Sequence, residues 1–330
     1  MKLSCLGEFG LIQKIARATP NGRGVRLGIG DDAAWVASNS GSCLITADLL
    51  LEGIHFDLRW TTLFALGHKT VAVNLSDIAA MGGIASYLIL SLGFPADFQS
   101  EDVDEFYRGI RSLSVKSGVA LVGGDISAAE SLVISACVVG YAPYRPVTRT
   151  GAKVGNDIYI TGTVGDSGLA LKLLKSKPSQ AAGKAMAYLL SRHTKPMPRL
   201  ATGALLARGR LATAMIDVSD GLLQDLGHIC QASGVGAVIW EETLPLSRAY
   251  RALAGNDGIR YALSGGEDYE LLFCARRRDR SRIKKMQKRA QVPITRIGRC
   301  APPTEGIRVL DLTGVPRVIR MKGHDHFKLK

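Results

Sequence analysis

The chain has 330 residues, 46% hydrophobic and 22% charged, which is typical of a globular protein and long enough for two domains. No apolar run reaches the roughly 18 residues that cross a bilayer, and the N-terminal stretch MKLSCLGEFG lacks a signal-peptide pattern. Six cysteines without a C-x-x-C pair fit a reducing compartment better than a disulfide framework or a zinc site. We therefore expect a cytoplasmic protein that does not bind a membrane.

The formal net charge of +13 raises the question of nucleic-acid binding. Much of this excess lies in residues 276–289, RRRDRSRIKKMQKR, where Ile283 and Met286 have helical spacing. The spacing favours a helix with a solvated basic face, and no nucleic-acid-binding motif accompanies it. A positive surface also raises the local concentration of anionic substrates such as nucleotides. A basic nucleic-acid-binding protein is therefore the most distant alternative.

Taken in chain order, the first half alternates between helices and strands. Apolar spacing and turn residues predict a helix over 8–18, strands over 24–37 and 42–56, helices over 63–83 and 101–118, and strands over 119–125 and 132–142.

Residues 142–156 mix two prolines with basic and turn residues and mark a domain boundary. A second succession of strands and helices begins at residue 157. We expect an N-terminal domain over 1–145 and a C-terminal domain over 146–330, each an α/β or α+β layer.

Aspartates recur at the ends of these elements, each beside Gly, Ala or Ser. Any one of them is equally well explained as a turn or helix-capping residue. A carboxylate near an apolar strand end must, however, be paired, hydrogen-bonded or metal-bound. Oxygen ligands without His or Cys suit Mg²⁺, which binds through carboxylates and phosphate oxygens. The series predicts a Mg²⁺–phosphate site and consists of Asp31, Asp32, Asp48, Asp77, Asp125, Asp217 and Asp220.

Two aspartates of this series and a serine lie in IDVSDGLLQDL, where a strand ends and a helix begins. Asp217, Ser219 and Asp220 would meet metal and phosphate at a helix N-terminus, which favours anions. Other phosphate and acyl-transfer motifs are absent: the sequence has no G-x-x-x-x-G-K-[ST], no protein-kinase motif set and no G-x-S-x-G. If the protein uses ATP, it does so through an aspartate-rich site.

Several motifs together resemble the thiamine-monophosphate kinase family. In chain order they are GEFGLI, GIGDDAA, TADLLLEGIHF, AVNLSDIAAMGG, LVGGD, TRTGAKVGNDIYITGTVGDS, IDVSDGLLQDLGHI, ALSGGEDYELLF and GHDHF, and they span essentially the whole chain. NLSDIAAMG and GGD are shared across the superfamily of aminoimidazole ribonucleotide synthetase, selenophosphate synthetase and a hydrogenase maturation protein. EGIHF combined with SGGEDYELLF is specific to the thiamine kinase.

The resemblance implies a two-domain synthetase-like fold of the α/β (α+β) class. The N-terminal sheet would pair with its twin into a dimeric β-barrel flanked by helices, and a C-terminal α/β domain would complete a cleft for ATP. The implied activity is direct in-line transfer of the γ-phosphoryl group of ATP to thiamine monophosphate, giving thiamine diphosphate. The implied cofactors are several Mg²⁺ ions and K⁺, and the implied partners are ATP, thiamine monophosphate and a second copy of the chain.

The resemblance also implies roles for individual residues, position by position. The implied metal ligands are Asp32, Thr46, Asp48, Asp77, Asp125, Asp217 and Asp220. The implied ATP contacts are Tyr107, Gly124, Asp125, Arg149 and Ser219. His55 and Glu267 match positions that contact the thiamine phosphate, and the residues expected to carry catalysis are Asp48, Asp77, Asp125, Arg149 and Asp217.

Two positions depart from the family pattern. Ala47 stands where Thr or Ser commonly precedes the aspartate of TADLL, which removes a side-chain ligand. His324 stands where an aromatic residue commonly follows the glycine of the terminal motif, so His324 would stack on the substrate with less area.

An alternative hypothesis is an enzyme with the same ATP site and a different acceptor substrate, as in a selenophosphate synthetase or an aminoimidazole ribonucleotide synthetase. A selenophosphate synthetase needs a reactive Cys or selenocysteine near its N-terminus, and Cys5 lacks the expected lysine context.

Overall fold

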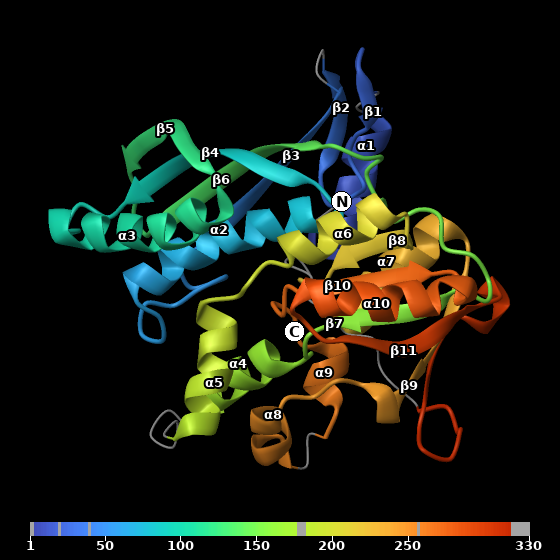
Figure 1. The fold of residues 1–330 in the computed structure, drawn as a ribbon. Helices are drawn as coiled ribbons and strands as arrows, with labels where there is room; N and C mark the ends of the chain where they lie inside the picture. Colours follow the sequence, from blue (N-terminus) through green and yellow to red (C-terminus); the bar gives the residue numbers. More distant parts are fainter. Residues whose placement is uncertain (1–2, 19–20, 39–40, 177–182, 256–257, 318–330) are drawn as a thin grey trace.

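The computed structural model describes residues 3–18, 21–38, 41–176, 183–255 and 258–317. These residues form two sheets, each covered by helices, which follow one another along the chain (Figure 1). The α/β (α+β) class with two successive units is therefore confirmed, while the boundary between residues 145 and 146 stays a prediction. In the described part of the chain, no helix is both long and apolar enough to span a membrane.

The N-terminal sheet has six strands in the order β1-β2-β3-β6-β4-β5. Its pairs are antiparallel except for β4 with β5. The strands are β1 (Val25–Leu27), β2 (Ala34–Ser38), β3 (Gly41–Leu51), β4 (Ile84–Phe94), β5 (Ala120–Ala128) and β6 (Val133–Ala142), and the helices are α1 (Leu3–Ala18), α2 (Leu63–Ala80) and α3 (Ser100–Ser117).

Helices α2 and α3 cover one face of this sheet (Figure 1). The hydroxyl of Thr62 accepts from the amide of Ala65 and caps the start of α2, and Gly118 ends α3 in the left-handed conformation at φ 69°. Helix α2 is buried on almost every side, because it packs on the N-terminal sheet and also on α6 and β8 of the second half. It therefore joins the two halves of the molecule.

The C-terminal sheet has the order β12-β9-β11-β7-β10-β8 and is antiparallel except for β12 with β9. Its strands are β7 (Asp157–Thr161), β8 (Ala212–Asp217), β9 (Gly236–Trp240), β10 (Leu271–Ala275), β11 (Ile294–Ala301) and β12 (Ile307–Leu310). Its helices are α4 (Asp166–Ser176), α5 (Lys184–Thr194), α6 (Leu200–Gly209), α7 (Leu222–Ser233), α8 (Arg248–Leu253), α9 (Arg260–Ser264) and α10 (Arg280–Ala290).

Both faces of the C-terminal sheet are buried. The side chains of one face pack with α4, α7, α8 and α9, and those of the other face pack with α6, α10 and the end of α2. Strands such as β7 and β10 are buried at every position, which explains their continuous apolar sequences. The second half is thus a helix–sheet–helix sandwich.

The basic run forms α10 and the short turn before it, with Ile283, Met286 and Ala290 buried, as the spacing predicted. Several of its arginines are paired with acids of the same domain. Arg280 contacts Asp157, while Arg276 and Arg282 contact Asp279. Packing of the apolar positions and these ion pairs therefore account for part of the run.

Candidate active site

Four aspartates from distant parts of the chain meet where α2 passes the end of β8. Asp32 comes from the loop before β2, Asp48 from β3, Asp77 from α2 and Asp217 from the last position of β8. Asp32, Asp77 and Asp217 each contribute one carboxylate oxygen, and these three oxygens lie within 4.8 Å of one another. Asp48 is close enough to raise the pKa of both Asp77 and Asp217. We call Asp32, Asp48, Asp77 and Asp217 the aspartate cluster.

The aspartate cluster carries more negative charge than its surroundings compensate. Burial raises the pKa of Asp48 to about 6, and burial with the charge of Asp32 raises the pKa of Asp217 to about 8. Burial and the neighbouring carboxylates, Asp48 first among them, raise the pKa of Asp77 well above its ordinary value. The Oδ2 atoms of Asp32 and Asp48 are buried without a hydrogen-bond partner. Such an oxygen-only set of unsatisfied acceptors fits a hard divalent cation such as Mg²⁺.

Two hydroxyl groups orient members of the aspartate cluster. Thr46 Oγ1 donates to Asp77 Oδ2 at 2.5 Å, and Ser76 Oγ donates to Asp217 Oδ2 at 2.5 Å. Ser76 belongs to α2 and Asp217 to β8, so the second bond joins the two halves of the molecule. Ser76 was missed at the sequence level, since a serine inside a helix carries no local sign of a distant partner.

Arg149 is the cation nearest the aspartate cluster. Its Nη2 donates to Asp32 Oδ1 at 2.6 Å, and its backbone amide donates to Asp31 Oδ2 at 3.0 Å. Burial and the charge of Asp32 raise the pKa of Asp31 to about 7 despite this arginine. The Nε atom of Arg149 is buried without a partner, so the guanidinium has a donor left for an anion at the same place.

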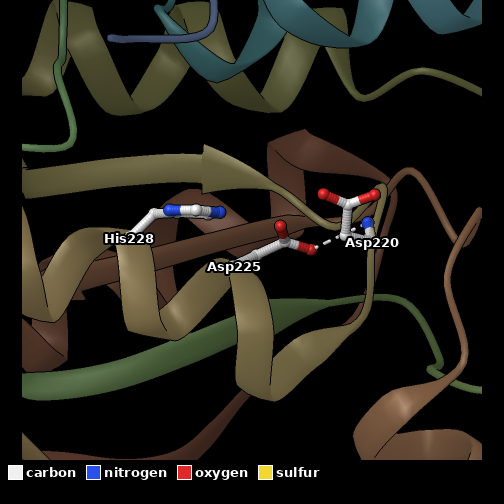
Figure 2. A group of neighbouring side chains, drawn as sticks. All are labelled: Asp220, Asp225 and His228. Carbon is white, nitrogen blue, oxygen red and sulfur yellow. Dashed lines mark hydrogen bonds between the residues drawn. The ribbon is translucent and has the colours of Figure 1, made fainter. Parts of the chain in front are cut away.

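A second acidic group begins at Asp220, just beyond β8 (Figure 2). Ligand atoms of Asp220, Asp225 and His228 lie within 4.8 Å of one another. Asp225 is fully buried and accepts from the amides of Asp220 and Gly221 at 3.1 and 3.0 Å, which ties down the start of α7. Burial and Arg149 lower the pKa of His228 to about 4, so this imidazole is neutral at pH 7. The D-x-x-H spacing inside α7 was the signal for Asp225 and His228, and it was overlooked.

Glu267 lies in the loop GGEDYE between α9 and β10. Its Oε1 pairs with Lys69 Nζ at 2.7 Å, and its Oε2 lies 3.1 Å from His193 Nδ1. Although burial alone would raise it, Lys69 and His193 hold the pKa of Glu267 below its ordinary value. The backbone amide of Glu267 donates to the carbonyl of Ser219 at 2.7 Å, which brings this loop beside the IDVSDG segment. Lys69 and His193 were not predicted.

Gly124 and Asp125 lie in β5, at the open edge of the N-terminal sheet, and both are exposed. The strand register places Gly124 in one row with Asp48 and Asp125 in one row with Leu49. Successive residues of a strand face opposite sides, so the Asp125 side chain is on the face opposite Asp48. Three strand spacings of about 4.8 Å also separate β5 from β3 by roughly 14 Å. Within one chain, Asp125 therefore lies apart from the aspartate cluster.

The remaining predicted residues occupy different places. His55 follows β3 and is half-buried, and its Nδ1 accepts from the amide of Leu51 at 3.0 Å, which leaves the ring proton on Nε2. Tyr107 is half-buried in α3 and packs at the edge of Phe106, whose ring centre lies 5.8 Å away. Ala47 is exposed on the face of β3 opposite Asp48, so a longer side chain there would point away from the aspartate cluster. His324 lies outside the described residues.

Two family models match the chain in succession. Residues 30–142 match the AIR synthase related protein N-terminal domain, and residues 153–310 match the AIR synthase related protein C-terminal domain. Thiamine-monophosphate kinase from Escherichia coli strain K12 is 39% identical over 97% of this chain and 98% of its own length. The enzyme of the same name from Bacillus subtilis is 34% identical over 98% of this chain and 100% of its own length. The chain belongs to the thiamine-monophosphate kinase family.

Solved structures agree with this membership. A structure described as AaThiL complexed with AMPPCP and TMP has a TM-score of 0.86 and 36% identity, and covers 99% of both chains. Thiamine-monophosphate kinase from Stenotrophomonas maltophilia has a TM-score of 0.77 and 37% identity, over 92% of this chain and 96% of its own. A HypE–HypF complex reaches a TM-score of 0.75 at only 18% identity, over 94% and 99%, which shows the shared fold alone. The family resemblance read from the sequence motifs is therefore confirmed.

Proposed function

We propose that the protein transfers the γ-phosphoryl group of ATP to thiamine monophosphate, producing thiamine diphosphate and ADP. The observation that carries the proposal is the aspartate cluster, whose buried acceptors lack partners and lie beside an arginine with a donor to spare. The relative bound to AMPPCP, an ATP analogue, and TMP supports both substrates. A cytoplasmic location stays a prediction from the sequence.

The aspartate cluster would hold Mg²⁺ together with the triphosphate of ATP. When bound, Mg²⁺ neutralises charge on the phosphate oxygens and fixes their positions. Asp32, Asp48, Asp77 and Asp217 are the proposed first ligands, with the Thr46 oxygen next to them and Asp220 at the edge. The number of Mg²⁺ ions and the requirement for K⁺ remain predictions of the family resemblance.

The chain has to bring two polyanions together, and this is an electrostatic task. The acceptor is a phosphate oxygen that is already largely anionic near pH 7, because the second pKa of a phosphate monoester is about 6. No general base is therefore needed. Arg149 would leave part of its contact with Asp32 and donate to a phosphate of ATP, and its buried Nε supplies one such donor. Holding the acceptor oxygen in line with the γ-phosphoryl group of ATP would then accelerate the transfer.

The other predicted contacts remain proposals for the same cleft. Ser219 and Asp220, at the start of α7, would meet the phosphates, and Tyr107 and Gly124 would contact ATP. His55 would donate from Nε2 to the phosphate of thiamine monophosphate. Glu267 would accept from the cationic part of the acceptor, and His324 would stack on it.

We further propose a homodimer in which each copy completes the site of the other. The face of the N-terminal sheet opposite α2 exposes large apolar side chains, among them Leu49, Tyr87 and Ile89, and Tyr87 is 53% exposed. Asp125 lies on the same face, in the row of Leu49, and belongs to the edge strand β5. A second copy packed on this face would close the sheet into a barrel and meet Asp125, so Asp125 would serve the partner's ATP site.

Mixing two inactive variants tests the shared site. Asp77→Asn and Asp125→Asn proteins are denatured together and refolded as a one-to-one mixture. If Asp125 acts on the partner, each mixed dimer has one intact site, and random pairing restores about a quarter of wild-type activity. If Asp125 acts within its own chain, every site lacks one aspartate and the mixture stays inactive, which would contradict the shared site.

The activity itself is tested by following the phosphorus resonances of ATP, Mg²⁺ and thiamine monophosphate incubated with the protein. We expect stoichiometric ADP and thiamine diphosphate. ADP with free phosphate and unchanged thiamine monophosphate would overturn the proposed acceptor and favour another acceptor within the superfamily.

A further inference from the structure

The loop Gly265–Glu270 has an unusual backbone. Glu267 and Tyr269 both adopt positive φ angles, 64° and 50°, although neither is glycine. Such conformations are unfavourable for residues other than glycine and persist where the surroundings hold them, most often at functional sites. Here the surroundings are specific: the Glu267 and Tyr269 amides donate to the carbonyls of Ser219 and Val218 at 2.7 and 2.9 Å.

Asp268, between these two residues, faces the other way and anchors the loop. Its carboxylate accepts from the amides of Gly165 and Ser167, at 2.5 and 3.4 Å, at the start of α4. With Asp268 fixed on that side, the Glu267 side chain is directed toward α2. The strained loop therefore presents one carboxylate to the helix that also carries Asp77.

Lys69 of α2 receives that carboxylate. Its side chain is only 4% exposed, whereas the Glu267 side chain is 25% exposed, so the pair has a buried cation and a carboxylate that stays partly accessible. Burying an ammonium group is unfavourable unless a partner compensates it. Among the described residues, Glu267 is the acid that pairs with Lys69. His193 adds a second contact, since its Nδ1 lies 3.1 Å from Glu267 Oε2 and 2.9 Å from Ser167 Oγ.

Helix α2 connects this ion pair to the aspartate cluster. Lys69 and Asp77 are eight residues apart, which corresponds to about 12 Å along a helix. One rigid element thus carries an aspartate of the cluster at one end and the partner of Glu267 at the other. A change at Lys69 would alter where Glu267 lies relative to Asp77 without touching the aspartate cluster.

We propose that Lys69 is a positioning residue for the acceptor substrate: its ion pair with Glu267, supported by His193, fixes the Glu267 carboxylate at a set distance from the aspartate cluster. This inference rests on the proposed function, because it takes the acceptor to be the molecule that Glu267 contacts. Lys69 acts through Glu267 and not on ATP.

The test compares Lys69→Met, Lys69→Arg and, as a control, Lys116→Met at an exposed lysine of α3. Thermal unfolding and the KM values for thiamine monophosphate and ATP are measured for each protein. Misplacing a group that positions the substrate by about 1 Å can cost roughly 100-fold. We expect Lys69→Met to raise KM for thiamine monophosphate by about that factor with an unchanged KM for ATP, Lys69→Arg to restore most of the loss, and Lys116→Met to match wild type.

A double variant separates action through Glu267 from a general structural effect. If Lys69 works through Glu267, then Lys69→Met/Glu267→Gln has the same KM for thiamine monophosphate as Glu267→Gln alone. This comparison also serves if Lys69→Met by itself fails to fold, since the double variant leaves no unpaired buried charge. The inference would be overturned if the effects of the two single changes on KM for thiamine monophosphate multiplied in the double variant. It would also be overturned if Lys69→Met raised the KM values for thiamine monophosphate and ATP equally, or if a folded Lys69→Met protein had an unchanged KM for thiamine monophosphate. Wild-type protein that makes no thiamine diphosphate would overturn the proposed function instead.

Discussion

Asp77→Asn is expected to have opposite effects on activity and on metal-free stability. Asp77 is surrounded by Asp32, Asp48 and Asp217, and only the Thr46 hydroxyl donates to it among the described residues. The variant keeps the shape of the side chain and removes one negative charge. It should lose a metal ligand and, at the same time, relieve repulsion inside the aspartate cluster.

The magnitudes follow from the geometry. Two carboxylates whose oxygens lie within 4.8 Å of each other repel by at least roughly 3 kcal/mol at an effective dielectric constant of about 20. Proton uptake by the cluster removes part of this repulsion, since burial raises the pKa of Asp217 to about 8. A gain of about 1 kcal/mol corresponds to a rise of roughly 1.5 °C in Tm for a chain of this size. Loss of one charge-stabilising contact should cost about 2.7–4 kcal/mol of the barrier, or 100- to 1000-fold in kcat.

The assay is a pair of measurements on wild type, Asp77→Asn and a matched control, Asp97→Asn, which changes an exposed aspartate in the loop before α3. Thermal unfolding is recorded in EDTA and in excess Mg²⁺, and kcat is measured with saturating ATP and thiamine monophosphate. We expect Asp77→Asn to have a higher Tm in EDTA, a smaller Mg²⁺-dependent rise and almost no turnover. A lower Tm in EDTA together with near-wild-type kcat would refute the reasoning, because Asp77 would then be an ordinary structural carboxylate.

Two further predictions follow from the same contacts. Because the pKa values of Asp48 and Asp217 are raised, the metal-free folded state binds extra protons, and the stability that these protons contribute is complete below the ordinary pKa of 3.8 and is lost as the pH rises through about 6 and 8. Tm in EDTA should therefore fall between pH 5.5 and 8.5, and Mg²⁺ should raise Tm most at pH 8.5. An effect of Mg²⁺ on Tm that does not depend on pH would contradict this prediction. Ser76→Ala removes a hydrogen bond to a charged group, worth about 1.5–3 kcal/mol; kcat should fall at least about tenfold with the fold retained by circular dichroism, whereas an unchanged kcat would exclude a role for Ser76 in orienting Asp217.

Local signals in the sequence predicted α1, α2, α3, β3, β5 and β6 of the first half but missed β4. Gly118 ends α3 in the left-handed conformation, and Ile283 and Met286 mark the buried side of α10. These features depend on neighbours in the chain, so spacing and turn residues suffice to find them. The long strand β3 was likewise expected from its run of apolar residues.

The composition of the site was predictable only in part. Asp32, Asp77 and Asp217 share motifs with the family, and the structure brings them together. Asp217 is held by Ser76, and Glu267 is held by Lys69. Ser76 and Lys69 lie in a stretch whose local sequence is typical of an ordinary buried helix. Their contacts depend on how α2 lies against the second half of the molecule, which no short-range pattern encodes.

The position of Asp125 shows the same limit for strands. A shift of one residue in strand pairing moves every side chain to the other face of a sheet. The GGD motif therefore could not reveal that Asp125 faces away from Asp48, because the register of β5 on β4 depends on the folded sheet. The proposal that two copies share the site therefore rests on the strand register.

The most direct test is a crystal structure of the protein grown with AMPPCP and Mn²⁺, an ion whose anomalous scattering locates it independently of the protein atoms. The account predicts Mn²⁺ between the triphosphate and the carboxylates of Asp32, Asp77 and Asp217, at roughly 2.2 Å from the oxygens, as for similar hard cations. Nucleotide bound elsewhere, with these carboxylates free of metal and each engaged only with its protein neighbours, would contradict it.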